Sequence, residues 1–288
     1  MTDGVVAVDK PTGWTSHDVV AKSRGLLGTK KVGHAGTLDP SATGVLVLGV
    51  GRATRLLRYL GDLPKAYVGE LVLGTETSTL DADGEVVRTH EMGAVTLDDV
   101  RRAAGGFVGP ILQVPPMVSA VKVDGRRLHE LARAGVEVER EARPVTVHSL
   151  SVEGHDEPGV FRLTVSCSGG TYVRTLAADI GTALGGGAHL RNLRRTAVGG
   201  FDLAGAVALD QLAPEAVRPP AEAVAHLPSV AVGEEVAADV AHGKVLPLDR
   251  LGATGDGPWA VLDGRGALLA VYRAHRQGTA KPDLVLPS

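Results

Sequence analysis

Apolar residues lie along the chain in short blocks whose spacing predicts both strands and helices. The continuous apolar run at 44–50 is typical of a strand that is buried on both faces. Further strands are expected at 4–8, 65–74, 144–152 and 160–168. Helices are expected at about 15–27, 56–60, 96–104, 128–134 and 173–184. Two of these helices begin with Thr and Asp three residues apart, which is the spacing of a capping box.

The pattern changes near residue 213 and predicts a second, smaller unit. Residues 213–228 hold four prolines and little regular periodicity, which indicates a connector. Beyond it, two apolar runs flank Asp263-Gly264, a pairing typical of a β-hairpin. We therefore expect an α+β fold with a larger domain over 1–212, a connector over 213–228 and a small, mostly β domain over 229–288.

Composition excludes several classes of protein. The 288 residues carry a net charge of -3 and are 44% hydrophobic, enough for a sizeable core. No apolar run approaches the roughly 20 residues of a membrane span, and no signal peptide is evident, so a cytoplasmic protein is expected. The single cysteine excludes a disulfide framework and a multi-thiolate zinc site.

The common cofactor-binding motifs are absent from the sequence or incomplete. The segment 49–54, GVGRAT, follows a predicted strand, but Thr54 replaces the third glycine of a dinucleotide loop. The sequence contains no phosphate-binding P-loop, no GxSxG and no HExxH, and its ten histidines show no metal-ligand spacing. Neither a cofactor nor a metal is expected.

The loop GHAGTLDP at 33–40 is the densest concentration of unusual residues. Its two glycines permit tight backbone, and Pro40 restrains Asp39 to an extended conformation. An aspartate held before a buried strand suits a preorganised site. The alternative is a turn in which Asp39 merely caps a neighbouring N–H group.

Two further residues are candidates for the same site. Arg174 follows a Gly-Gly turn and falls in the first turn of a predicted helix, where a cation opposes the helix dipole. A buried carboxylate partner would explain that placement, although a solvent-exposed arginine is an equal alternative. Tyr67 lies at the start of a predicted strand and, taken alone, is typical of an ordinary strand aromatic.

Five blocks of the sequence, in order, resemble one enzyme family. They are GVVAVDKPTGWTSHDVV, GHAGTLDPSATGVLVLGVGRAT, KAYVGELVLGTETSTLDADGE, QVPPMVSAVKVDGRRLHELARAG and CSGGTYVRTLAADIG. Together they resemble the bacterial tRNA pseudouridine-55 synthases of the TruB type over about residues 4–200. The position and length of the C-terminal unit also match the small RNA-binding PUA domain of that family.

The resemblance implies a fold, a reaction and a partner. The fold would be that of pseudouridine synthases, with a mixed, largely antiparallel sheet flanked by helices, plus a PUA-like domain. The reaction would convert the T-loop uridine of tRNA into its C-glycoside isomer without metal or cofactor. The partner would be the T-arm of tRNA, with no membrane or protein partner and a monomeric enzyme.

The resemblance also implies roles for individual residues. Asp39 would be the catalytic aspartate, and Arg174 would keep it ionised, with the guanidinium fork able to make two bonds to one carboxylate. Tyr67 would stack on the extruded uracil, with a second possible role as general base at the sugar. Asp81 would bind the base or orient the arginine, with Asp83 as the runner-up for this task.

The remaining substrate-binding candidates are Lys10, His34 and Tyr172. Lys10 in DKP matches a family lysine near the site, His34 would contact the distorted T-loop, and Tyr172 lies in the block that carries Arg174. The segment 113–145, with Lys122, Arg126, Arg127 and Arg133, resembles an RNA-clamping insertion that is mobile in the family.

Base flipping costs a few kcal/mol, so phosphate contacts are needed to hold the bent loop. Arg191, Arg194 and Arg195 are candidates for such contacts. Two other functions remain open: a tRNA-binding or tRNA-folding module without catalysis, and a pseudouridine synthase that acts on another RNA.

Overall fold

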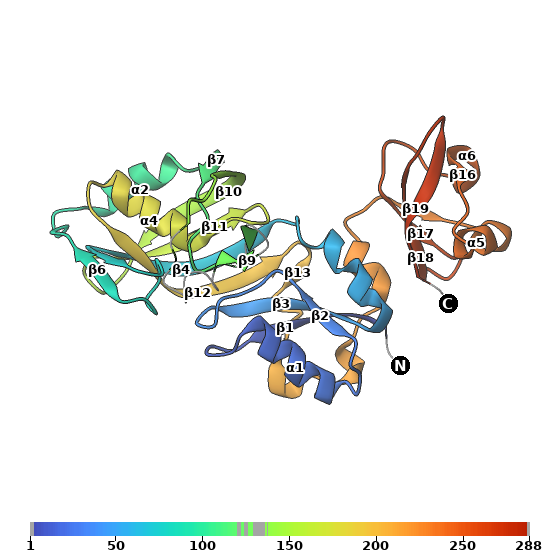
Figure 1. Ribbon diagram of the computed structural model, residues 1–288, viewed down its shortest axis with the longest axis horizontal. Helices are drawn as coiled ribbons and strands as arrows, with labels where there is room; N and C mark the ends of the chain where they lie inside the picture. The colour runs from blue at the N-terminus through green and yellow to red at the C-terminus, as the bar shows by residue number, and fades with distance from the viewer. Residues whose placement is uncertain (1–2, 120–121, 124–125, 129–135, 137, 287–288) are drawn as a thin grey trace.

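The computed structural model describes residues 3–119, 122–123, 126–128, 136 and 138–286. Figure 1 shows a two-lobed larger part at the left and centre, and a separate small unit at the right that holds the end of the chain. Within the described residues, no helix is both long and apolar enough to cross a lipid bilayer.

The helical elements are α1 (Ser16–Leu26), η1 (Gly51–Tyr59), α2 (Leu97–Gly105), α4 (Val173–Ala183), η2 (Leu209–Gln211), η3 (Pro214–Ala216), η4 (Pro220–Val224), α5 (Glu234–Ala241) and α6 (Leu248–Leu251), where η marks a 3-10 helix. The strands of the larger part are β1 (Gly4–Lys10), β2 (Val32–Ala35), β3 (Thr43–Val50), β4 (Lys65–Leu73), β5 (Thr75–Thr77), β6 (Val86–Thr89), β7 (Gly109–Gln113), β8 (Lys122–Val123), β9 (Arg126–Arg127), β10 (Arg143–Gly154), β11 (Val160–Cys167), β12 (Ala188–Val198), β13 (Phe201–Asp202) and β14 (Val207–Ala208). The C-terminal strands are β15 (Ser229–Ala231), β16 (Leu246–Pro247), β17 (Trp259–Leu262), β18 (Leu268–Ala274) and β19 (Thr279–Val285).

One ten-stranded sheet forms the larger part. Its main path is β14-β1-β3-β12-β4-β11-β10-β7, with β2 paired to β3 and β13 paired to β12. Among the described strand pairs of this sheet, only β1–β14 and β3–β12 are parallel. The predicted mixed, largely antiparallel sheet is therefore confirmed, and β12 joins the two lobes by pairing with both β3 and β4.

The continuous apolar run of β3 reflects burial on both faces. Val45 and Val47 pack with η1 in one core, whereas Leu46 and Leu48 point to the other face and pack with α1. All four side chains are fully buried. This strand leads directly from the loop that holds Asp39, so the loop is anchored on the most buried element of the sheet.

Both predicted capping boxes are present. Thr15 caps α1 and Thr96 caps α2, each accepting a hydrogen bond from the N–H of an Asp three residues later. The predicted helix at 56–60 is instead a longer 3-10 helix, η1. Of the predicted helix at 128–134, all but Leu128 lies outside the described residues.

The C-terminal unit is a five-stranded sheet in the order β15-β17-β18-β19-β16. The predicted hairpin around Asp263-Gly264 is confirmed as the β17–β18 pair. One face of this sheet packs Trp259 and Tyr272 into its own core. The other face packs Ala260 and Val271 into a core shared with η1 and η4, so the unit is joined to the larger part by apolar contacts.

The segment 213–228 is more structured than its sequence indicated. It contains η3 and η4, and Ala223 and Val224 of η4 are fully buried in the shared core. Short 3-10 turns leave no long periodic signal, which explains why the pattern suggested a simple connector.

Candidate active site

Asp39 lies in the loop between β2 and β3, and the loop is held from two sides. Ser16 of α1 accepts a hydrogen bond from the Leu38 N–H at 2.9 Å and donates to the Leu38 carbonyl at 3.1 Å. The ammonium of Lys10 donates to the Pro40 carbonyl at 3.0 Å. Gly36 adopts a φ of 80°, the left-handed region that glycine enters without strain. The loop therefore fixes the Asp39 backbone while the carboxylate remains 36% exposed.

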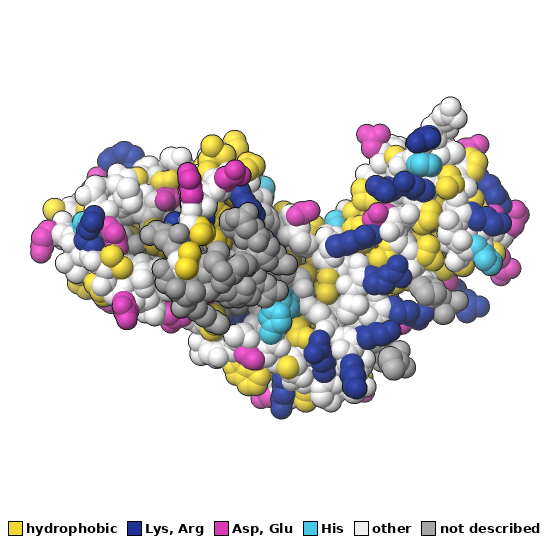
Figure 2. Space-filling view, in the orientation of Figure 1, with side chains coloured by type: hydrophobic (Ala, Val, Ile, Leu, Met, Phe, Trp, Pro, Cys, Tyr) yellow, Lys and Arg dark blue, Asp and Glu magenta, His cyan; other side chains and the backbone are white. Residues whose placement is uncertain are grey.

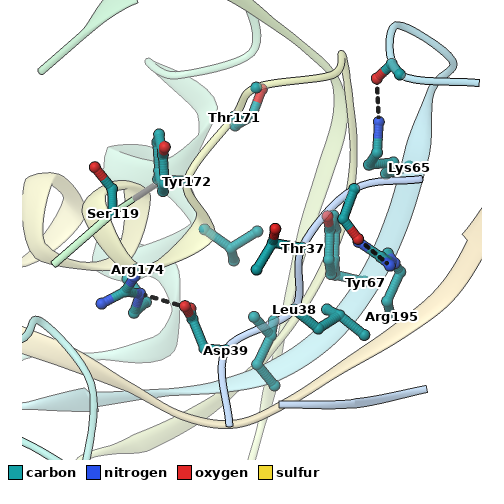
Figure 3. A pocket seen from close by; sticks show the side chains of 15 residues that line it. Thr37, Leu38, Asp39, Lys65, Tyr67, Ser119, Thr171, Tyr172, Arg174 and Arg195 are labelled. Atoms are coloured by element: carbon teal, nitrogen blue, oxygen red, sulfur yellow. Dashed lines mark hydrogen bonds and ion pairs between the residues drawn. The ribbon is translucent and has the colours of Figure 1, made fainter. Parts of the chain in front are cut away.

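The carboxylate of Asp39 lines a cavity of about 270 Å³ between the β2–β3 loop, β4, β12 and the start of α4. Figure 3 shows Asp39, Tyr67, Tyr172 and Arg174 around it. The full lining consists of Gly36, Thr37, Leu38, Asp39, Gly61, Lys65, Tyr67, Ser119, Gly170, Thr171, Tyr172, Val173, Arg174, Leu193 and Arg195. Such a cavity is smaller than a typical drug-sized pocket and is of a scale suited to one nucleoside.

Arg174 is buried and its guanidinium contacts two carboxylates. Its Nε lies 3.0 Å from Oδ2 of Asp39, and its Nη1 lies 3.3 Å from Oδ2 of Asp81. The remaining hydrogen bonds go to the carbonyls of Thr79 at 2.8 Å and Val118 at 2.9 Å. The expected Asp39–Arg174 pair is present, but the expectation of two bonds from the fork to one carboxylate is wrong, because the fork is divided among four partners.

Asp81 is held in place by its own chain. Its Oδ1 accepts hydrogen bonds from the Thr79 hydroxyl and, at 3.2 Å, from the Asp83 N–H. This leaves Oδ2 directed at Arg174, with the side chain 13% exposed. Between the two predicted tasks of Asp81, this geometry favours orienting the arginine.

Burial and the neighbouring charges shift the pKa of the Asp39 carboxyl in opposite directions. Burial raises the pKa of the Asp39 carboxyl, Arg174 lowers it, and Asp81 and Asp83 raise it again, so that the pKa lies above its ordinary value. Burial is the largest of these influences. The arginine thus reduces the upward shift of the pKa without abolishing it, because burial and the neighbouring carboxylates together outweigh its positive charge.

Two tyrosines border the cavity from different elements. Tyr67 of β4 is 7% exposed, and burial raises the pKa of its hydroxyl, with Arg195 opposing the shift. Tyr172 is the N-cap residue of α4. Its backbone N–H donates to Oε1 of Gln113 at 2.7 Å, and its carbonyl accepts from Nε2 at 3.1 Å, so that a single amide ties β7 to the start of α4.

Lys10 and His34 do not line this cavity. The fully buried Lys10 donates to the carbonyls of Pro11, Trp14 and Pro40. Burial lowers the pKa of Lys10 to about 8. His34 packs edge-on against His17 with ring centroids 5.3 Å apart, and burial lowers the pKa of its ring. The structure therefore gives Lys10 a positioning task beneath the Asp39 loop.

Nothing in the sequence indicated that Gln113 and Lys65 belong to the site. Lys65 lines the cavity and donates to the carbonyls of Gly61 and Leu63 at 2.7 and 3.1 Å. Both side chains are nearly fully buried. No local pattern could have found them, because each contacts backbone that no short motif identifies.

The arginines of β12 are not a free phosphate-binding cluster. Arg191 pairs with Glu70 and Glu157, each at 2.6 Å. Arg194 pairs with Asp9, and the fully buried Arg195 lines the cavity and donates to backbone carbonyls. Figure 2 shows that basic side chains are instead plentiful toward the lower right and over the C-terminal unit.

The proposed RNA-clamping insertion is only partly described. Strands β8 and β9 form a two-stranded hairpin within it. Arg133 lies outside the described residues, as does the whole of the segment 129–135. The expected clamping action therefore stays a prediction.

Comparisons with known proteins agree on one family. The N-terminal domain of the TruB family of pseudouridylate synthases matches residues 24–173, and the C-terminal domain of tRNA pseudouridylate synthase B matches residues 174–226. The chain is 46% identical to tRNA pseudouridine synthase B of Arthrobacter sp. (strain FB24), covering 99% of this chain and 97% of the relative. It is 48% identical to the protein of that name from Thermobifida fusca (strain YX), covering 99% of each.

Solved structures of low but significant identity share the fold. One chain of a Cbf5-Nop10-Gar1 complex matches with a TM-score of 0.74 at 29% identity, covering 99% of this chain and 84% of that one. A chain of an H/ACA RNP bound to a substrate RNA containing 2′-deoxyuridine matches with a TM-score of 0.75 at 27% identity, covering 99% and 85%. From its full-length similarity and its shared fold, the chain belongs to the TruB family of pseudouridylate synthases and is an enzyme of the isomerase class.

Proposed function

We propose that this enzyme isomerises the T-loop uridine of tRNA, position 55, to pseudouridine, with Asp39 as the catalytic carboxylate. The observation that carries the proposal is the placement of Asp39 at the wall of a nucleoside-sized cavity, 3.0 Å from the buried Arg174. The names of the relatives, tRNA pseudouridine synthase B, support tRNA as the substrate.

The reaction balances without an oxidant or a second substrate. The bond between N1 of uracil and C1′ of ribose breaks, the base rotates, and a bond forms between C5 and C1′. C5 loses a proton and N1 gains one. The ionised carboxylate of Asp39 would act as the nucleophile or stabilise positive charge at the sugar, and the Arg174 guanidinium favours this ionised form.

Tyr67 is suited to stacking on the uracil. Its ring borders the cavity on the β4 side, and base–aromatic stacking returns about 1–3 kcal/mol of the cost of extrusion. The raised pKa of its hydroxyl argues against a general base at neutral pH. Tyr172, from the N-cap of α4, would define the opposite wall.

The proposal is tested with an unmodified tRNA transcript and purified enzyme. Pseudouridine mapping should find one new residue, in the T-loop, and release of tritium from C5 of labelled uridine should follow the same time course. Asp39→Asn should bind tRNA with nearly unchanged affinity and give at least 1,000-fold slower isomerisation. Because the folded protein disfavours the ionised carboxylate, the neutral amide should leave the melting temperature unchanged or raise it.

Activity near wild type in Asp39→Asn would refute the catalytic assignment. Modification of another RNA, with no product in tRNA, would refute the substrate. Tight tRNA binding by wild type without any isomerisation would instead support the binding or folding module.

A further inference from the structure

A second groove lies beside the active site and has no part in the chemistry above. Its volume is about 600 Å³. It is bordered by the end of β1, the loop before α1, the start of β3, and η2. The lining consists of Asp9, Lys10, Pro11, Trp14, Lys22, Thr43, Arg194, Ala208, Leu209 and Asp210.

Trp14 gives this groove an aromatic wall. It is one of only two tryptophans, and it is 37% exposed, whereas Trp259 is 1% exposed and donates its indole N–H to the Thr254 carbonyl. The Trp14 backbone carbonyl accepts a hydrogen bond from Lys10 at 2.6 Å, so the residue is fixed while its ring remains accessible. A rigid, accessible indole in a groove is a stacking platform for a flat ring.

The groove carries three basic and two acidic side chains and an incomplete hydrogen-bond set. Lys22 is exposed and makes no ion pair with any described residue. Arg194 is 39% exposed and pairs with Oδ2 of Asp9 at 2.7 Å. The other oxygen, Oδ1 of Asp9, is buried without a hydrogen-bond partner among the described residues. Buried polar atoms are seldom left unpaired, which suits a groove that a polar ligand completes.

The Lys10 side chain connects this groove to the Asp39 loop. The Lys10 ammonium binds the Trp14 carbonyl on one side and the Pro40 carbonyl, next to Asp39, on the other. The Gly13 N–H also donates to the Pro40 carbonyl at 2.8 Å. Both loops are therefore bound together, which places the groove next to the loop that carries Asp39.

We propose that this groove binds a second, unpaired nucleotide of the RNA substrate, with its base stacked on Trp14 and its phosphate near Lys22. The proposal rests on the proposed function, since it requires an RNA whose target nucleotide is at Asp39. The combination of an exposed aromatic with a neighbouring cation is how proteins bind single-stranded nucleic acid without reading its sequence.

Intrinsic fluorescence tests the stacking directly. In the Asp39→Asn protein, which holds the substrate unreacted, titration with unmodified tRNA should quench the exposed Trp14 emission. Trp14→Phe in the same background is the matched control. It retains only the buried Trp259, so it should bind tRNA without quenching. Equal quenching in both proteins, or no quenching while a filter assay records full binding, would overturn the proposal.

Affinity and kinetics provide the second test, in the otherwise wild-type enzyme. Trp14→Ala should weaken tRNA binding by about 5- to 150-fold, the range of one base–aromatic stack, while Trp14→Phe should recover most of it. The loss should appear in KM, with kcat little changed. Thermal melting confirms that each variant is folded, which is expected because only the backbone of Trp14 bonds to Lys10.

The salt dependence of tRNA binding tests the role of Lys22. Lys22→Ala should reduce the slope of log Kd against log salt concentration by about 0.7–0.9, the loss of one phosphate contact. Unchanged tRNA affinity in both Trp14→Ala and Lys22→Ala would exclude a nucleotide from the groove. A failure of the proposed function would look different, because wild type would then show no T-loop isomerisation whatever happens at Trp14.

Discussion

At the scale of the residue, the site depends on one guanidinium shared by two carboxylates. The family resemblance implied the pairing of Asp39 with Arg174, whereas the position of Arg174 in the first turn of a helix left an unspecified carboxylate partner and an exposed side chain as equal alternatives. The contact between Asp81 and Arg174 fits the expectation that Asp81 orients the arginine, but the sequence did not indicate that one guanidinium would be divided between Asp39 and Asp81. This division depends on where the turn between β5 and β6 lies relative to the start of α4, and no spacing along the chain encodes that contact.

Replacement of Arg174 by lysine tests this sharing. An ammonium on a shorter, flexible stem cannot contact Asp39, Asp81 and the carbonyls of Thr79 and Val118 at once. Arg174→Lys should therefore reduce kcat/KM by at least 100-fold, measured by tritium release. Rates within a few-fold of wild type would show that only the charge matters.

The raised pKa of Asp39 predicts the acid side of the pH–rate profile. The ionised carboxylate is the active form, so activity should be lost as pH falls through the raised pKa, at a higher pH than the ordinary value of about 3.9 implies. Asp83→Asn removes one of the charges that raise this pKa. Its acid limb in kcat/KM should move to lower pH, and movement in the opposite direction would contradict the assignment.

At the scale of the element, several long strands and helices were predicted, whereas other strands, including β12 between the two lobes, and the functional junctions were not. The apolar run of β3, the two capping boxes and the β17–β18 hairpin all have local signals, and all are present. The link from β7 to α4 through Gln113 has none, because an isolated glutamine in a sequence gives no indication of the backbone that it will meet 59 residues later.

The hydrogen bonds between Gln113 and Tyr172 lead to a testable prediction. Gln113→Ala would leave buried backbone groups of Tyr172 unpaired, which costs roughly 1–3 kcal/mol. We expect a melting temperature several degrees lower, measured by circular dichroism, and a reduced kcat because Tyr172 borders the cavity. Gln113→Glu keeps an acceptor for the Tyr172 N–H but buries a charge and sets a second acceptor against the Tyr172 carbonyl, so at neutral pH it should be at least as damaging; stability equal to wild type would contradict this account of the bonds.

At the scale of the whole molecule, the C-terminal unit is attached through polar as well as apolar contacts. Asp283 of β19 accepts hydrogen bonds from Tyr59 and Arg58 of η1, each at 2.6 Å. Burial and this contact raise the pKa of Tyr59 to about 12. The sequence predicted the existence of the unit from its strands, but not its attachment, since the two sides of this contact are 224 residues apart.

Loss of the Asp283 contact should loosen the attachment without affecting the chemistry. Asp283→Ala removes the shared acceptor of Arg58 and Tyr59, and we expect faster proteolytic cleavage between residues 213 and 228 with kcat unchanged. Asp263→Ala, in the distant β17–β18 turn, is the control and should not change cleavage there. Equal protection of Asp283→Ala and wild type would mean that the apolar contacts suffice.

The shared packing of η1, η4 and the second face of the C-terminal sheet has a practical consequence for deletion work. A protein truncated after residue 228 would lack Ala260, Val271 and Leu284, which pack in the same core as Leu56 and Val224. The shortened protein would expose this apolar surface to water and should precipitate or self-associate. Low activity of such a fragment would therefore reflect its poor solubility and would be no evidence for lost contacts with RNA.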